Sequence, residues 1–243
     1  MKVTHIITGL GQGGAEMVLY RLLGALDRVE FTNEVISLTG GGTIADKIRD
    51  LGIPVRELGL RPSLPNPLKF FRLAGWLRQC RPDAVQTWMY HADLLGGLAA
   101  RLVGVPAVYW GLHHSTLDPA RDKPATIRVA RLCARLSRWL PRRIAACSLA
   151  SIREHTNLGY AFEKMSHIPN GIDTHQFRPD TSARAALRQE LGVAQTAQLV
   201  GMAARFHPHE HFAPMRPYAP RGCTARRIRV RIHQVVATLL LHD

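Results

Sequence analysis

Short β-branched runs alternate with single helical segments over roughly the first 206 residues, and this alternation limits the possible fold more than any other feature. Strands are expected at residues 2–8, 33–39, 53–58, 83–87, 106–111, 143–148 and 164–168. Helices are expected at residues 15–26, 43–51, 67–80, 91–103, 123–140 and 149–158. Strands joined through single helices make right-handed crossovers, which build a parallel sheet with helices on both faces. The sequence therefore predicts an α/β fold with a doubly wound, Rossmann-like parallel sheet. Such sheets bind ligands beyond the carboxyl ends of their strands.

The composition is that of a globular protein with a strong basic excess. Apolar residues make up 46% and charged residues 21% of the chain, which argues against disorder and fibrous structure. Lysine and arginine number 32 against 18 acidic residues, so the formal net charge is +14. This charge predicts attraction to anionic partners, among them phosphates, a membrane surface and nucleic acid.

The cysteines and the most apolar stretch indicate a cytoplasmic protein. The four cysteines are scattered and form no C-x-x-C pair: Cys80, Cys133, Cys147 and Cys223. This spacing argues against a disulfide scaffold or a structural zinc site and fits a reducing compartment. Residues 94–112 contain Arg101 and a Gly-Val-Pro break, so we interpret them as a buried helix followed by a buried strand.

A glycine-rich turn, G-L-G-Q-G-G-A-E at residues 9–16, follows the first expected strand. Glycines allow a tight turn and close approach of a ligand, and the next helix directs its free N–H groups at an anion. Gly9, Gly11 and Gly14 also satisfy the dinucleotide pattern G-x-G-x-x-G. A nicotinamide site needs an acidic residue at the end of the second strand, whereas this strand ends Ser-Leu-Thr-Gly at residues 37–40. The NAD interpretation is therefore rejected, and a loop that only shapes the turn stays as the alternative.

Basic residues recur every three or four positions along the expected helix 123–140. They form one stripe, made by Arg128, Arg131, Arg135 and Arg138 and continued by Arg142. An adjoining apolar stripe comprises Val129, Leu132, Cys133, Leu136 and Leu140. One interpretation is the solvated face of a core helix, and the other is docking onto anionic lipid. Nucleic-acid binding ranks behind both, because the chain shows no helix-turn-helix spacing or interleaving of aromatic and basic residues.

The last 37 residues differ from the rest of the chain. They hold five of the twelve histidines, six arginines and no lysine, and four prolines at positions 208–220 forbid a continuous helix or central strand there. Residues 228–241 have room for one short element. We interpret the segment either as a basic surface tail or as the product of a coding frame lost near residue 208.

Two motifs together resemble a known family. They are G-Q-G-G-A-E at residues 11–16 and S-H-I-P-N-G-I-D-T-H-Q-F-R-P at residues 166–179, the second preceded by H-T-N-L-G-Y at 155–160 and by Lys164. They resemble the nucleotide-sugar-dependent glycosyltransferases of group 1 (family 4), which have the two-domain GT-B fold. In the second motif, Asn170 and Gly171 predict a turn with positive φ, and Asp173 is expected to cap the residues after it.

The resemblance implies a domain division. Residues 1–168 would form the Rossmann-like acceptor-side domain, residues 169–182 the interdomain linker, and residues 183–207 the start of the donor domain. That start comprises a helix at 183–191 and a strand at 199–206 that ends in the family's arginine, Arg205. Residues 208–243 would be an atypical basic tail and no domain of their own.

The resemblance also implies a site and a reaction. The family transfers a sugar, with retention of configuration, from a nucleoside diphosphate sugar to an acceptor, and it needs no metal or other cofactor. His113 would be catalytic and face the sugar, and His114 beside it is the alternative. The substrate and donor-phosphate contacts would come from Gly11, Gly13, Gly14, Glu16, His114, Asn170, Gly171 and Arg205. Glu16 would brace the loop or bind acceptor.

The chain also departs from the family. No lysine follows Lys164, and the only acidic residues after Glu190 are Glu210 and Asp243, so the family's donor-holding E-x7-E pair is missing from these residues. We therefore expect an incomplete second lobe, truncated or frame-shifted, and negligible sugar transfer by this chain alone. The expected partners are a nucleotide-sugar donor, a glycan or lipid-linked acceptor of cell-surface polysaccharide or glycolipid synthesis, and an anionic membrane. The expected location is the cytoplasm, peripheral on the inner face of the plasma membrane.

Overall fold

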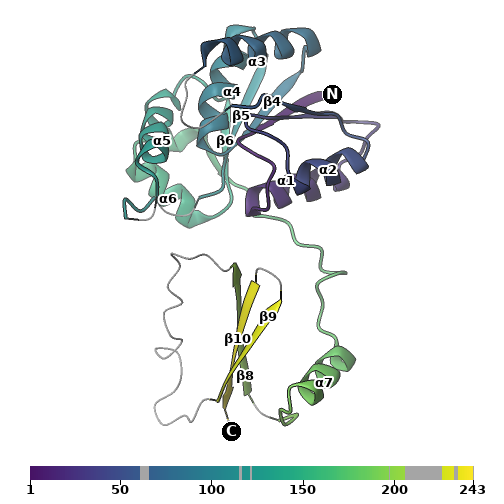
Figure 1. Cartoon of the computed structure of the whole chain (residues 1–243). Coiled ribbons are helices and arrows are strands. Elements are labelled where there is room, and N and C mark those ends of the chain that lie inside the picture. The colour runs from purple at the N-terminus through teal and green to yellow at the C-terminus, as the bar shows by residue number, and fades with distance from the viewer. Residues whose placement is uncertain are drawn as a thin grey trace. The chain divides into compact units, whose positions relative to one another are not determined.

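A computed structural model describes residues 1–60, 66–114, 117–120, 122–196, 198–205, 226–232 and 235–242, with side chains described up to residue 196. The chain divides into two compact units, Met1–Gly171 and Ile172–Asp243. Figure 1 shows the elements that make up each unit.

The first unit is built on a seven-stranded sheet with the order β3-β2-β1-β4-β5-β6-β7. All neighbouring strands pair in parallel. The strands are β1 (Lys2–Ile7), β2 (Thr32–Ser37), β3 (Val55–Glu57), β4 (Ala84–Trp88), β5 (Ala107–Leu112), β6 (Arg143–Ala146) and β7 (Met165–His167). Strand β1 is buried over almost its whole length, as expected of a strand with helices on both sides.

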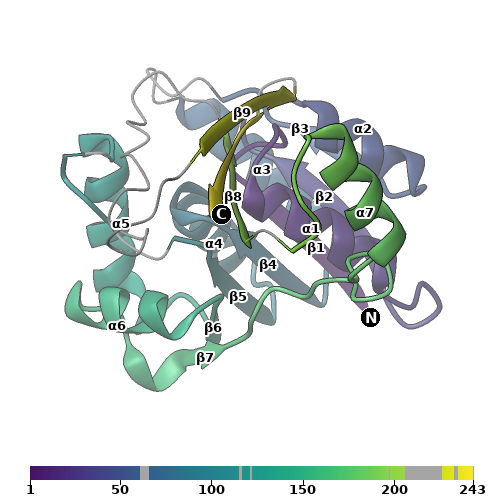
Figure 2. The ribbon, with the colours of Figure 1, turned by 90° about the horizontal axis from the view of Figure 1, so that it is seen from below.

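The helices of this unit are α1 (Gly14–Ala25), α2 (Thr43–Asp50), α3 (Pro67–Cys80), α4 (Tyr90–Leu102), α5 (Pro124–Leu136) and α6 (Leu149–Asn157), with a short 3-10 turn at Phe162–Lys164. Helix α1 packs beside α2, and α4 packs between α3 and α5 (Figure 2). Two apolar clusters result. One includes Leu19, Leu23 and Ile48 from α1 and α2, and the other includes Leu73, Leu77 and Cys133 from α3 and α5.

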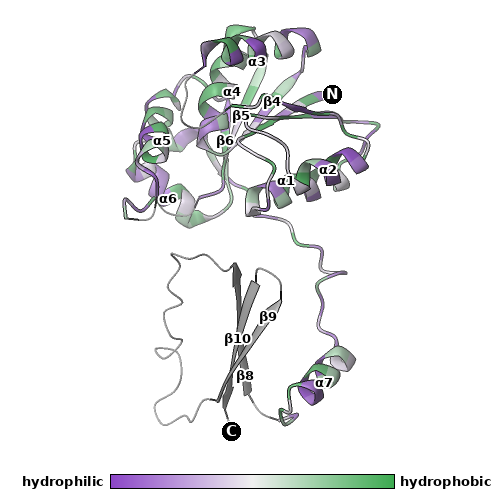
Figure 3. Cartoon of the chain, viewed as in Figure 1, coloured by the Kyte–Doolittle hydropathy of each residue, from purple (hydrophilic) through white to green (hydrophobic). Residues whose placement is uncertain are grey.

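Both clusters lie against the same sheet, so helices cover each face of it. Figure 3 shows the apolar colour along the strands of this sheet and mixed colours on the surrounding helices. A sheet that is apolar on both sides is typical of parallel α/β folds. The predicted α/β class and the doubly wound parallel sheet are confirmed.

One helix of the first unit ends earlier than the sequence predicted. Helix α5 stops at Leu136 instead of residue 140. The Ser137 hydroxyl donates to the Ala134 carbonyl at 2.7 Å and accepts from the Ala161 N–H at 2.9 Å. These side-chain bonds end the helix locally and attach it to the segment after α6. Leu132, assigned to the apolar stripe, is 42% exposed.

The second unit contains α7 (Thr181–Glu190) and a three-stranded antiparallel sheet with the order β8-β10-β9. Its strands are β8 (Gln198–Arg205), β9 (Arg226–Ile232) and β10 (Val235–His242). The expectation of one short element at residues 228–241 is wrong, because two strands form there and β10 pairs with both β8 and β9. The prolines at 208–220 and Cys223 lie outside the described residues.

The motif at residues 166–179 behaves partly as predicted. The Asp173 carboxylate accepts from the N–H groups of His175 at 2.9 Å and Gln176 at 3.2 Å, which confirms the predicted cap. The predicted positive-φ turn is wrong, because neither Asn170 nor Gly171 has a positive φ. The segment runs extended after β7, so it does not need the left-handed conformation.

Candidate active site

The strand order reverses direction between β1 and β4. From β1 the chain proceeds outward through β2 and β3, and from β4 it proceeds the other way through β5, β6 and β7. At such a switch point the loops after neighbouring strands diverge and leave a crevice for a ligand. Ile7 and Trp88, at the carboxyl ends of β1 and β4, stand opposite each other in the sheet. The glycine-rich turn, Met89 and His113 therefore follow the ends of three consecutive strands at one edge.

The glycine-rich turn leads into α1 without a side-chain cap. Gly13 is the cap residue, and the first helical hydrogen bond runs from the Met17 N–H to the Gly13 carbonyl at 3.1 Å. The three preceding N–H groups of the helix therefore have no backbone partner, and they carry the positive end of the helix dipole. Gly11 and Gly14 are exposed. This is the geometry that the sequence predicted for contact with a phosphate.

The Glu16 side chain lies over this turn. A Cβ atom added to Gly13 would lie 2.1 Å from Glu16 Oε2, so the carboxylate folds back over the Gly13 backbone. A carboxylate in the first turn of a helix stabilises the helix N-terminus. The two roles predicted for Glu16, bracing the loop and binding acceptor, stay predictions.

A second glycine loop supports the first one, and the sequence analysis missed it. Gly40, Gly41 and Gly42 follow β2, and a Cβ on Gly42 would lie 2.5 Å from the Leu10 carbonyl oxygen. The Ile44 N–H donates to that same oxygen at 3.2 Å. The two loops thus touch backbone to backbone, which only glycine at position 42 allows. Three consecutive glycines after a strand end were the available signal.

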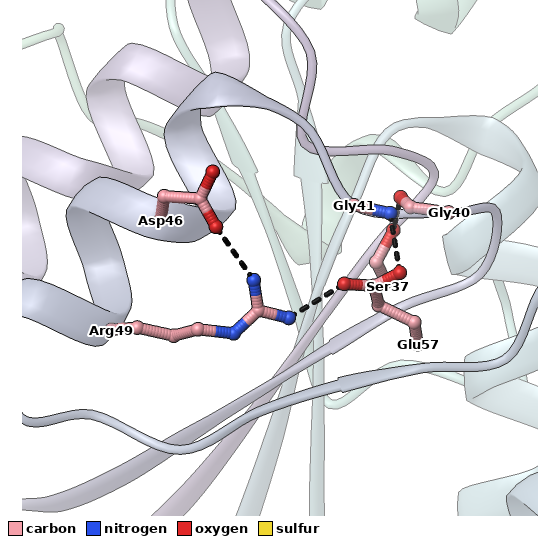
Figure 4. A network of polar contacts seen from close by, with 6 residues as sticks. All are labelled: Ser37, Gly40, Gly41, Asp46, Arg49 and Glu57. Atoms are coloured by element: carbon pink, nitrogen blue, oxygen red, sulfur yellow. Dashed lines mark hydrogen bonds and ion pairs between the residues drawn. The ribbon is translucent and has the colours of Figure 1, made fainter.

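Polar contacts fix this second loop (Figure 4). Glu57 Oε2 accepts from the Gly41 N–H at 2.7 Å, and Glu57 Oε1 accepts from Arg49 at 2.6 Å. Arg49 also pairs with Asp46 at 2.8 Å, and the Ser37 hydroxyl donates to the Gly40 carbonyl at 2.9 Å. The Arg49 guanidinium lowers the pKa of Glu57, so the carboxylate stays ionised and holds Gly41.

His113 is held flat against Trp88. The two rings are stacked with centroids 4.9 Å apart and planes 13° apart. Trp88 in turn donates from Nε1 to Nδ1 of the buried His5 at 3.3 Å, and Nε2 of His5 lies 3.1 Å from Asn33 Oδ1. Desolvation by burial lowers the pKa of His113 to about 4, with a further contribution from the neighbouring His114. His113 is therefore a neutral imidazole at neutral pH.

His114 belongs to the other face of the sheet. Its ring stacks on Tyr90 with centroids 5.0 Å apart, and the Tyr90 hydroxyl lies 2.7 Å from Nε2 of His155. Tyr90 packs in the cluster formed with α3 and α5, whereas Trp88 packs with Leu10 and the α1–α2 cluster. The structure thus places His113 on the side of the glycine-rich turn and His114 away from it.

Met89, between Trp88 and α4, has a strained backbone that the sequence did not reveal. Its φ of 72° and ψ of 157° lie in a region that is essentially restricted to glycine. The Met89 N–H donates to the Gly111 carbonyl at 3.1 Å, and the Met89 carbonyl accepts from the Asp93 N–H at 2.9 Å. Strain of this kind is concentrated at functional sites, and here it lies at the switch point.

The other predicted residues belong to other elements of the chain. Asn170 and Gly171 are exposed at the end of the first unit, and Arg205 ends β8 of the second unit with its side chain outside the described part. Arg128, Arg131, Arg135 and Arg138 are all exposed along and just beyond α5. Among the described residues, no group of three or more His, Cys, Asp and Glu side chains could hold a metal ion. No helix within the described ranges has the length and apolar content to span a bilayer.

Comparison with known proteins decides the family. The sequence profile of glycosyltransferase family 4 matches residues 12–176, which is more than half of the chain. The chain belongs to glycosyltransferase family 4. The matched segment begins inside the glycine-rich turn and ends within the second motif that carried the resemblance.

Two curated relatives are similar to this chain. EpsF of Bacillus subtilis (strain 168), which is named as a glycosyltransferase, is 26% identical over 87% of this chain and 56% of its own length. The UDP-Gal:alpha-D-GlcNAc-diphosphoundecaprenol alpha-1,3-galactosyltransferase of Escherichia coli is 23% identical over 87% of this chain and 55% of its own length. The chain therefore spans about half the length of the curated relatives it matches.

The structures are similar in fold. HepE of Anabaena, solved in complex with UDP, has a TM-score of 0.64 and 23% identity over 79% of this chain and 50% of that one. The lipopolysaccharide outer core galactosyltransferase WaaB has a TM-score of 0.53 and 15% identity over 71% of this chain and 46% of that one. These likenesses confirm that the parallel sheet is of the kind found in GT-B lobes.

Proposed function

We propose that this chain provides the acceptor side of a retaining, nucleotide-sugar-dependent glycosyltransferase that builds cell-surface polysaccharide or glycolipid. Family membership supports the reaction class. The names of relatives support the substrates, because the Escherichia coli relative is named for UDP-Gal and a diphosphoundecaprenol acceptor, and HepE was also solved with UDP-glucose. The donor would be a UDP-sugar, and the acceptor would be lipid-linked.

The observation that carries the proposal is the placement of His113. Its ring lies flat on Trp88, at the sheet edge that also holds the glycine-rich turn and on the same face. A neutral imidazole can both donate and accept a hydrogen bond, so it suits a sugar hydroxyl better than a charged one would. His113 would hydrogen-bond a hydroxyl of the acceptor sugar and so orient it in the crevice.

The free N–H groups at the start of α1 would stabilise negative charge on the substrate. Preorganised donors of this kind act without reorganisation in the transition state, and they suit a reaction whose main demand is charge stabilisation. Gly11, Gly13 and Gly14 let a diphosphate approach the backbone closely. Asn170 and Gly171, which follow β7 at the same edge of the sheet, would add donor contacts.

Acceptor binding tests the proposal. A short-chain lipid diphosphate carrying GlcNAc is titrated into the wild type, His113→Ala and the control His167→Ala, which changes an exposed histidine at the end of β7. Loss of the hydrogen bond to the sugar is expected to weaken binding by His113→Ala on the order of tenfold. The His167→Ala variant is expected to bind like the wild type. Equal binding by all three proteins would contradict the assignment of His113.

Sugar transfer tests the rest of the proposal. The chain has no E-x7-E pair after Glu190, so we propose that it transfers negligible sugar from a radiolabelled UDP-sugar to the same acceptor. Clear turnover would contradict this inactivity, and the anomeric configuration of the product, read by NMR, would then decide whether transfer retains configuration.

A second candidate function is peripheral binding to the anionic inner face of the plasma membrane. Four arginines are exposed along α5 and its C-terminal turn, and Trp139, directly after Arg138, is 70% exposed. Basic residues and a surface tryptophan are typical of membrane contact. Co-sedimentation with anionic vesicles is expected to fall for an Arg131/Arg135/Arg138→Glu variant, and equal binding would contradict this function.

A further inference from the structure

The pairing of β4 with β5 stops before either strand ends. The last residues in register are Gln86 and Tyr109, although β4 continues to Trp88 and β5 continues to Leu112. On its other side, each of these strands stays paired with its neighbour up to its last residue. The carboxyl ends of β4 and β5 therefore separate beside the candidate active site, and contacts outside the sheet ladder must fix the end of β5.

The side chain of Asp93 joins these two strand ends. Asp93 is in the first turn of α4 and is fully buried. Its Oδ1 lies 2.5 Å from the hydroxyl oxygen of Thr87 in β4, and the Gly111 N–H of β5 hydrogen-bonds to the same carboxyl group. The backbone of Met89 is bonded to both Gly111 and Asp93, as described above. The carboxyl group thus takes the place of strand pairing where the ladder has ended.

The hydrogen bonds of Thr87 indicate that Asp93 carries a proton. The Thr87 hydroxyl oxygen also lies 3.2 Å from the Tyr109 carbonyl oxygen, which can only accept. A hydroxyl has one hydrogen, so Thr87 can donate to Tyr109 and still bond to Asp93 only if the Asp93 carboxyl group donates to it. Burial outweighs the bonds from Thr87 and Gly111 and raises the pKa of Asp93 well above its ordinary value, which favours the same protonated form.

The surroundings of Asp93 also favour a neutral carboxyl group. Among the residues that the structure describes, Asp93 forms no ion pair that would keep it charged. The titratable groups that interact with it electrostatically are Tyr90 on α4, Cys133 on α5 and Tyr160 after α6. Burial raises the pKa of each of them, so all three are neutral at neutral pH. Oδ2 of Asp93 has no hydrogen-bond partner within the described part of the chain, which is costly for a charged oxygen.

Gly111 connects this arrangement to the candidate active site. A Cβ atom added to Gly111 would lie 2.8 Å from the Thr87 carbonyl oxygen and 3.4 Å from His113 Nε2. The His113 ring therefore lies over the Gly111 backbone as well as against Trp88. A shift of the end of β5 would move this ring.

We propose that Asp93 is a positioning residue of the candidate active site, whose protonated carboxyl group fixes the end of β5 and thereby holds His113 in the crevice. Its consequence for acceptor binding rests on the function proposed above. Because Asp93 is fully buried, it acts through the Gly111 backbone and does not touch the substrate. Asparagine should be able to replace it, since an amide offers a donor and an acceptor as a protonated carboxyl group does, whereas an ionised carboxylate offers no donor.

The position of His113 is tested in the free chain by an NMR pH titration of its ring. In the wild type, burial holds the pKa of His113 at about 4. Asp93→Ala should release the end of β5 and let water reach the ring, so the pKa should rise by about one unit or more toward the ordinary 6.5. Asp93→Asn should leave it at the wild-type value. An unchanged pKa in Asp93→Ala, or an equal rise in Asp93→Asn, would overturn the proposal.

A matched control separates positioning from general loosening of the fold. Asp83 Oδ2 accepts from the Lys2 N–H at 2.7 Å, so Asp83→Ala also removes a carboxylate that bonds to a strand backbone, but at the amino edge of the sheet. It should leave the pKa of His113 unchanged, and a rise equal to that of Asp93→Ala would overturn the proposal. Circular dichroism checks folding. If Asp93→Ala does not fold, Thr87→Val, which removes only the hydroxyl of the cluster, should raise the pKa of His113, and no rise would overturn the proposal.

Titration with the short-chain GlcNAc lipid diphosphate distinguishes this inference from the proposed function. Asp93→Ala should bind on the order of tenfold more weakly than the wild type, whereas Asp93→Asn and Asp83→Ala should bind like it. Normal binding by Asp93→Ala would overturn the positioning role. A wild type that does not bind this acceptor would contradict the proposed function, while the ring pKa in the free chain would still decide the role of Asp93.

Discussion

Acid should destabilise the first unit through two neutral histidines, His5 and His113, at the edge of the candidate active site. Desolvation by burial lowers the pKa of His5 to about 4, and burial likewise lowers that of His113 to about 4, from the usual 6.5. Between these values the unfolded chain binds protons that the folded chain does not, so stability must fall as the pH falls below 6.5. Above that range both histidines are neutral in both states, and the effect disappears.

The size of the effect can be worked out from the pKa values. A pH of 5 is about 1.5 units below the pKa of each histidine in the unfolded chain. At about 1.36 kcal/mol per unit, each histidine then lowers the free energy of unfolding by about 2 kcal/mol. His5 and His113 together should therefore lower the free energy of unfolding by about 4 kcal/mol from pH 7 to pH 5. This is a large share of the stability of a typical domain.

The assay is urea unfolding followed by tryptophan fluorescence at pH 7 and pH 5. All four tryptophans, at positions 76, 88, 110 and 139, lie in the first unit, so their fluorescence reports on that unit alone. In a His5→Gln variant the amide can still accept from Trp88 and donate to Asn33, but it cannot titrate. Its loss of stability between the two pH values should be smaller than that of the wild type by about 2 kcal/mol. The same loss in both proteins would refute the reasoning.

Three other predictions concern the support of the same edge. Gly42→Ala, whose Cβ would meet the Leu10 carbonyl at 2.5 Å, should cost about 1–3 kcal/mol in urea unfolding. Gly75→Ala, with open space around its Cβ, should cost nothing, and equal costs would contradict the loop contact. Glu57→Gln should lower the free energy of unfolding by about 0.5 kcal/mol at low salt and leave it unchanged in 1 M salt, since the Arg49–Glu57 pair is partly exposed. Burial raises the pKa of Asp93, so its carboxyl group should make wild-type stability fall as the pH rises above the ordinary carboxyl pKa of 3.8, and Asp93→Asn should abolish this contribution. An unchanged pH dependence in Asp93→Asn would contradict the burial argument.

The sequence predicted the order and type of the elements of the first unit well. Each buried strand is a short apolar run, and the helices show apolar residues spaced three or four positions apart. Neither signal needs knowledge of distant residues. The end of α5 was wrong because the Ser137 hydroxyl bonds to Ala134 and to Ala161, and the second of these contacts joins parts of the chain that only the fold brings together. The strand pair at 226–242 was missed because its pairing with β8 likewise depends on tertiary contacts.

The site could be predicted only in outline. The glycine-rich turn and His113 follow strand ends, and a parallel sheet brings strand ends to one edge, so their proximity was predictable. The stacking of His113 on Trp88, the contact of Trp88 with His5 and the strain at Met89 were not, because ring orientation and backbone angles depend on packing. The Gly40–Gly41–Gly42 loop was visible in the sequence and could have been found by the reasoning that singled out residues 9–16.

The most direct measurement is an NMR titration of the labelled chain with the short-chain GlcNAc lipid diphosphate. It monitors the amides of Gly11, Gly13 and Gly14 together with the ring of His113, and uses the exposed His167 as an internal reference. If these groups line one crevice, all of them should shift with a single dissociation constant while His167 stays unchanged. Shifts confined to the glycines or to His113, or two different dissociation constants, would show that the two do not form one substrate site.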